Sequence, residues 1–82
     1  MTPDKIEGCT RTLGAPAGWD QTRDGRCGGL EIRDQKIDRI NRMYSAWTLN
    51  DAERAAIAAG GRVILTVLGD VHPPVSIIVE AP

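Results

Sequence analysis

The single histidine of this chain lies in a short connection whose residue types suit contact with a ligand. His72 precedes the only Pro-Pro pair, Pro73 and Pro74, within residues 69–75. Proline fixes its own φ and pushes the residue before it toward extended geometry, so the imidazole is presented from a stiff support. An imidazole also changes charge near neutral pH. We expect His72 and Pro73 to contact a ligand; the alternative is a loop histidine that bonds a local carbonyl group.

Two tryptophans form a second group that could bind a ligand. Trp19 follows a Gly- and Pro-rich loop, and Trp47 lies just before an alanine-rich stretch. An indole ring that stacks on a nucleobase contributes about 1–3 kcal/mol per base. Both rings are therefore candidate stacking platforms, and the alternative for each is a place in the hydrophobic core.

Arginine supplies a third group. Eight of the ten basic residues are arginine, which binds phosphate and carboxylate groups in a bidentate manner. Arg11, Arg26 and Arg42 lie in or beside polar segments and are candidates to pair with a phosphate. Thr48 and Asn50 stand where a helix is expected to begin, and backbone N–H groups at a helix start can also hold an anion. For any one of these arginines the alternative is a solvated charged surface.

The sequence contains little that could form a catalytic site. It has no Gly-rich phosphate loop, HExxH motif or CxxC pair. Cys9, Cys27 and His72 are too few for a zinc site, which takes four ligands, so we expect free thiols and no metal. Asp70 and His72 are the one conceivable general-base pair. We expect a protein that is not an enzyme and uses no cofactor, with a small hydrolase based on His72 as the weakest alternative.

Length and composition limit the class of protein. The 82 residues predict a single domain over residues 1–82, and the net charge of −1 argues against coating a long nucleic acid. No apolar run is long enough for a membrane span or a signal peptide, so we expect a cytoplasmic protein. Aromatic residues make up only 4% of the chain, so the core must be aliphatic. Because small aliphatic cores gain stability by association, we expect a homo-oligomer, either a dimer or a tetramer.

The clearest predicted element is a helix over residues 51–59. Asn50 is a favourable N-cap residue, and Glu53 stands three positions later, where a capping box requires it. Alanine fills most of the following positions, and Gly60 and Gly61 are typical of a helix end. So many small side chains predict that this helix packs closely on a sheet.

Three segments before this helix are predicted to be strands. Alternation of apolar and polar residues predicts strands at residues 29–33 and 42–48, and less clearly at residues 6–13. Residues 34–42 are predicted to form an exposed connection that holds a short helical turn.

Two more strands are predicted after the helix. Residues 63–68 and 75–79 are aliphatic on both faces, which is typical of central or interface strands, and they should pair antiparallel. The predicted order is β-β-β-α-β-β. The fold class is therefore α+β, a small antiparallel sheet with one Ala-rich helix packed on it.

Several short motifs resemble those of a group of small proteins encoded by phages and prophages. The resemblance covers residues 6–79, and its motifs are Gly18-Trp19-Asp20, Ser45-Ala46-Trp47 and His72-Pro73-Pro74-Val75. The group usually begins the helix after its tryptophan with Pro-Thr, whereas Thr48-Leu49-Asn50 keeps a capping residue and loses the proline. Most of the group has no assigned function.

The phage context implies a class of function. Small phage proteins often counter host defence, and one kind forms symmetric oligomers that sequester cyclic nucleotide immune signals without cleaving them. The resemblance thus implies an anti-defence sponge in the bacterial cytoplasm, which binds a cyclic dinucleotide or similar phosphate-bearing small molecule at a homo-oligomer interface. The alternative is a protein-interaction module that inhibits a host protein or serves as a virion accessory factor.

Overall fold

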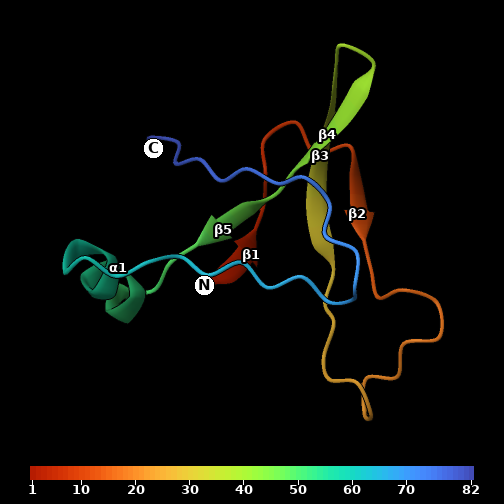
Figure 1. Ribbon diagram of the computed structural model, residues 1–82, viewed down its shortest axis with the longest axis horizontal. Helices are drawn as coiled ribbons and strands as arrows, with labels where there is room; N and C mark the ends of the chain where they lie inside the picture. The colour runs from red at the N-terminus through yellow and green to blue at the C-terminus, as the bar shows by residue number, and fades with distance from the viewer.

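The strands and the single helix all lie in the first three quarters of the chain. The computed structural model describes residues 1–82 and contains five short strands followed by one helix (Figure 1). All strand pairs are antiparallel and form a two-stranded and a three-stranded sheet. The fold is therefore α+β in class.

The three-stranded sheet is built around β3 (Leu30–Ile37), which lies between β2 (Arg11–Leu13) and β4 (Ile40–Tyr44). Ile32 on β3 is the only fully buried residue, with 4% of its surface exposed. The hydrophobic core of this chain is therefore very small and lies at the centre of this sheet. The strand predicted at residues 29–33 is confirmed, and it continues to the end of β3.

The connection predicted at residues 34–42 is instead a β-hairpin, so that prediction is wrong. Asp38 and Arg39 form its two-residue turn with φ of 51° and 68°, the positive values that a type I′ turn requires. Ile37 and Ile40, whose i, i+3 spacing in the sequence favours one or two helical turns, are instead paired across the hairpin beside the turn. The pair Asp-Arg is not a usual sequence signal for such a turn, and this explains the error.

The second sheet joins the start of the chain to the segment before the helix. β1 (Thr2–Asp4) pairs with β5 (Ala46–Thr48), which places Pro3 opposite Trp47. The sequence does not predict β1, because its residues are mostly polar and include a proline. Proline is tolerated here because β1 is an edge strand.

Two predicted strands differ at their ends from those observed. The strand predicted at residues 42–48 is divided at Ser45, so its two parts belong to different sheets. The strand predicted at residues 6–13 is shortened to β2, because the chain turns at Gly8. Gly8 has a φ of 76°, which only glycine adopts readily.

α1 (Asp51–Ala58) is capped as predicted but does not pack on a sheet. The Asn50 side chain accepts a hydrogen bond from the Glu53 backbone N–H at 2.8 Å, and the Glu53 carboxylate accepts one from the Asn50 N–H at 3.0 Å. No residue of α1 is buried, and the helix lies to one side of both sheets (Figure 1). The predicted packing of its alanines is therefore wrong for the single chain. Its length and apolar character do not suffice to cross a membrane.

The strands predicted at residues 63–68 and 75–79 do not form in the single chain. This run leaves α1, passes β1, reaches the three-stranded sheet and then returns to the side of the helix (Figure 1). None of the backbone hydrogen bonds involves residues 62–82. The predicted order β-β-β-α-β-β is thus replaced by five strands followed by a helix, with an extended aliphatic run after it.

Candidate functional site

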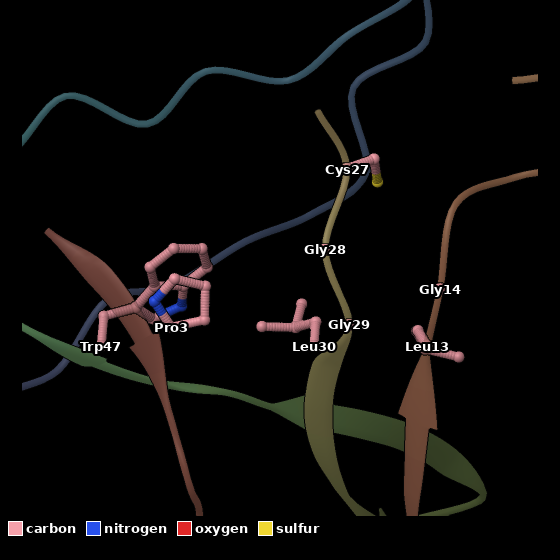
Figure 2. A pocket seen from close by; sticks show the side chains of 8 residues that line it. All are labelled: Pro3, Leu13, Gly14, Cys27, Gly28, Gly29, Leu30 and Trp47. Atoms are coloured by element: carbon pink, nitrogen blue, oxygen red, sulfur yellow. The ribbon is translucent and has the colours of Figure 1, made fainter. Parts of the chain in front are cut away.

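A hollow of about 410 Å³ lies between the two sheets. Figure 2 shows Pro3 and Trp47 of one sheet on one side of it, and Leu30 and Leu13 of the other sheet across from them. The chain that leads into β3 forms the rest of the wall through Cys27, Gly28 and Gly29, together with Gly14 after β2. We call this the Trp47 hollow.

The Trp47 ring is held in place at the rim of the hollow and remains accessible. Its indole Nε1 donates a hydrogen bond to the Ser45 hydroxyl at 2.9 Å, and 46% of the residue is exposed. On the opposite wall, a Cβ at Gly29 would lie 3.2 Å from Cγ2 of Thr12. Glycine therefore allows the entry to β3 to pass close to β2, and this leaves backbone rather than side chains on that wall.

The lining of the Trp47 hollow is apolar and carries no charged side chain. It can accept an aliphatic group or a flat ring that stacks on Trp47. Arg26 directly precedes Cys27 of the lining and is exposed, without an ion pair or a side-chain hydrogen bond. Arg26 is therefore the candidate to pair with an anionic group attached to a ring bound in the hollow.

Trp19 lies outside this hollow and closes its own loop. Its Nε1 donates a hydrogen bond to the Gly25 carbonyl at 2.9 Å, and its backbone N–H donates to the Pro16 carbonyl at 3.1 Å. The ring is half-buried. The structure thus separates the two tryptophans into a loop-closing residue and a residue at the hollow.

Arg11 is already paired with a carboxylate. Its Nε and Nη2 donate to the two Asp34 oxygens at 2.9 and 3.0 Å. Asp34 also accepts hydrogen bonds from the Thr10 hydroxyl at 2.5 Å and from the Asn41 amide at 2.8 Å. These hydrogen bonds, that of Thr10 first, then Asn41 and Arg11, lower the pKa of Asp34 to about 2. Arg42, by contrast, is exposed and unpaired.

We call the group of Thr10, Arg11, Asp34 and Asn41 the Asp34 cluster. The sequence does not predict it. Thr10 precedes β2, Asp34 lies on β3 and Asn41 on β4, so the three meet only in the observed register. Once the hairpin is known, the i, i+7 spacing of Asp34 and Asn41 across a two-residue turn would have indicated the contact. The cluster links β2, β3 and β4. The two Asp34 oxygens already accept four hydrogen bonds within the chain.

The predicted anion-binding groups at the helix start are used within the chain. The Thr48 hydroxyl donates to the Asp4 carboxylate at 2.5 Å, and this hydrogen bond is the main cause of the lowered pKa of Asp4. The Asn50 side chain accepts a hydrogen bond from the Glu53 N–H. Thr48 therefore links β5 to β1, and Asn50 caps the helix.

His72 bonds its own neighbour. Its Nδ1 lies 2.6 Å from the Pro73 carbonyl oxygen, which is the local carbonyl contact considered as the alternative above. Both residues are exposed, and neither lines the Trp47 hollow. Asp70 forms no hydrogen bond with His72. The structure therefore brings His72 and Pro73 together with none of the other candidate residues.

The remaining chemistry-bearing side chains do not form a cluster. Cys9 is exposed and Cys27 is half-buried, and both are free thiols. No group of three or more His, Cys, Asp or Glu side chains is placed to hold a metal ion.

No protein-family model, curated protein or solved structure matches this chain. The resemblance to phage proteins therefore stays a prediction.

Proposed function

We propose that this protein is a non-catalytic protein-interaction module whose contact surface is the aliphatic segment, residues 62–80. The observation that carries the proposal is the exposure of nearly every large aliphatic side chain in that segment. The exposed residues are Val63, Ile64, Leu65, Leu68, Val71, Val75, Ile77, Ile78 and Val79.

The energetic reason is the hydrophobic effect. Complete burial of one Val, Leu or Ile side chain contributes about 1.5–3 kcal/mol. Large exposed apolar surface marks an interaction site on a stable protein. Covering the aliphatic segment would therefore supply a favourable contribution that opposes the entropic cost of association.

The backbone of the aliphatic segment supports binding by strand addition. It makes no backbone hydrogen bonds, and its β-branched residues favour an extended conformation. A partner strand would satisfy these N–H and C=O groups and cover the side chains in one step. Residues 63–68 and 75–79 would then become the strands that the sequence predicts. Inhibition of a host protein and a role as a virion accessory factor both fit this mode of action.

The test is site-specific photo-crosslinking in cells that produce the protein. A benzoylphenylalanine replaces Ile77, which is 60% exposed in the aliphatic segment. The control carries it at Lys36, an exposed position on β3. We expect position 77 to capture a polypeptide, identified by mass spectrometry, and position 36 to capture none. Equal or absent capture at both positions would overturn the proposal.

A second candidate function is capture of a cyclic dinucleotide or similar nucleotide by an oligomer in the bacterial cytoplasm. The observation in its favour is the exposed Trp47 ring at a hollow whose volume, about 410 Å³, falls in the range of small-molecule sites. A nucleobase would stack on Trp47, and Arg26 would pair with a phosphate. Arg42 and His72 do not line the hollow, so in this proposal another copy contributes them.

Calorimetry with a panel of cyclic dinucleotides tests this second candidate. Trp47→Ala should abolish binding, because it removes the stacking surface, and Arg26→Ala should weaken it about tenfold. Arg39→Ala, in the β3–β4 turn, is the matched control and should bind normally. Absence of heat from every ligand at about 100 µM protein would exclude binding in the useful range.

A further inference from the structure

We infer that the partner of the aliphatic segment is a second copy of this chain, and that the two copies exchange strands. Residues 62–67 of one copy pair antiparallel with residues 75–80 of the other, and the reverse pairing closes the dimer. This inference rests on the proposed function, which makes the aliphatic segment a contact surface, and it names the occupant.

The first support is the exposed area. The single chain of 8.9 kDa exposes 7355 Å², whereas a compact monomer of this mass exposes about 4,800 Å². The excess of about 2,500 Å² per copy corresponds to the larger interfaces of obligate homodimers. The radius of gyration is 14.7 Å, against about 11.7 Å for a compact chain of this length. A second copy supplies an interface of the required size.

The second support is the shortage of backbone hydrogen bonds. The chain makes 24 of them, while about 55 are expected for 82 residues. None involves residues 62–82. Two reciprocal ladders between copies would provide partners for the N–H and C=O groups that the single chain leaves unpaired.

The third support is complementarity in one register. When Thr66 is placed opposite Ser76 of the second copy, Arg62 falls opposite Glu80, so both polar pairs match. All other opposed residues are aliphatic. One face of the ladder then carries only Val63, Leu65, Val67, Val75, Ile77 and Val79. A shift by one residue would mix the two faces, and a shift by two would separate the charges.

The connection between the two runs explains why the pairing occurs between copies. A hairpin within one chain would have to reverse direction across residues 68–74. Pro73 and Pro74 stiffen this connection, and proline disfavours helical geometry at His72 before it. In the single chain the two runs lie apart (Figure 1). Glu80 instead approaches Arg33 with an N–O distance of 3.8 Å. Stiff connections of this kind favour strand exchange, and reciprocal exchange closes after two copies.

Disulfide trapping between two differently tagged proteins tests the inference. Both carry Cys9→Ser and Cys27→Ser; one also carries Thr66→Cys and the other Ser76→Cys. Opposed positions in an antiparallel ladder lie within reach of a disulfide. We expect a mixture of the two to form a covalent heterodimer on mild oxidation. Thr66 and Ser76 are exposed, so neither substitution endangers folding of the single chain.

The control replaces the first protein by one with Lys36→Cys, and it should form at least about tenfold less heterodimer. Light scattering on the unmodified protein should give the mass of a dimer. A monomer, or trapping no better than the control, would overturn the inference. A double variant with Thr66→Cys and Ser76→Cys in one chain should also form dimers; a disulfide-bonded monomer would show a hairpin within one chain and overturn the exchange.

The photo-crosslinking experiment separates failure of this inference from failure of the proposed function. Capture of a different polypeptide at position 77 by a protein that stays monomeric would leave the interaction module intact and exclude the dimer. Capture of no polypeptide would contradict both the proposed function and the dimer.

Discussion

Residues 1–58 and residues 62–80 differ in how far their backbone and polar groups are paired within the chain. In the first region the strands are paired, the helix is capped, and the side chains of Arg11, Thr48 and Asn50 are bonded to other residues of the chain. In the second region the backbone is unpaired and the large aliphatic side chains face water. Bonding capacity that a chain leaves unused is available to a partner. The comparison therefore supports the proposal that the second region is the contact surface and that the first supports it structurally.

The largest expected effect comes from placing a charge in the aliphatic segment. Ile77→Asp should weaken self-association at least about 100-fold, because it would bury an unpaired carboxylate at several kcal/mol. Ile40→Asp is the matched control: Ile40 is 68% exposed and Ile77 60%, but Ile40 lies on β4 in the first region. Sedimentation at several concentrations measures both. Equal dissociation of the two variants would contradict the division into regions.

The second prediction concerns the Asp34 cluster and pH. The pKa of Asp34 is lowered from 3.8 to about 2 in the folded chain. A lowered folded pKa stabilises the fold fully above about pH 4, and this contribution is lost as the pH falls toward about 2. Asp34→Asn should therefore lower the urea midpoint at neutral pH, and the difference from the unmodified protein should shrink over that pH range.

Asp70→Asn is the control for this experiment, because Asp70 lies in the second region and forms no ion pair. Its urea midpoint should follow that of the unmodified protein at every pH. A pH-independent difference for Asp34→Asn would mean that the Thr10, Asn41 and Arg11 contacts do not stabilise the ionised carboxylate.

The elements that the sequence predicts correctly are those determined by neighbouring residues. The helix cap needs only Asn50 and Glu53, three positions apart, and the start of β3 needs only the alternation around Ile32. Both signals act within one turn or one strand. They are therefore visible before any tertiary contact is known.

The features that escape prediction depend on pairing between distant residues. The Trp47 hollow exists because Pro3 pairs with Trp47 across 44 positions of sequence, and the Asp34 cluster requires the register of three strands. The aliphatic run at residues 63–68 shows the reverse case. Its strand signal is strong, but a strand forms only where a partner is present, and the single chain does not provide one.

A smaller effect is expected from removal of the helix cap. Asn50→Ala deletes the acceptor for the Glu53 N–H, which should cost about 0.5–2 kcal/mol and lower the helical signal in circular dichroism. Self-association should be unchanged, because the cap belongs to the first region. Dissociation of Asn50→Ala would instead show that the start of α1 is part of the contact surface. Asn50→Asp, which keeps a capping oxygen, should restore most of the lost stability.

The smallest expected effect is a gain of stability in the hairpin turn. Arg39 has a φ of 68°, which glycine adopts without the strain of a side chain, and Asp-Gly is a favoured pair for this turn. Arg39→Gly should raise the stability by about 0.5–1 kcal/mol. Arg42→Gly makes the same chemical change within β4, where glycine weakens a strand, and should lower stability by a similar amount. Shifts of the urea midpoint in opposite directions would confirm the hairpin. A lower midpoint in both variants would instead favour the helical turn indicated by the spacing of Ile37 and Ile40, because glycine destabilises a helix at either position.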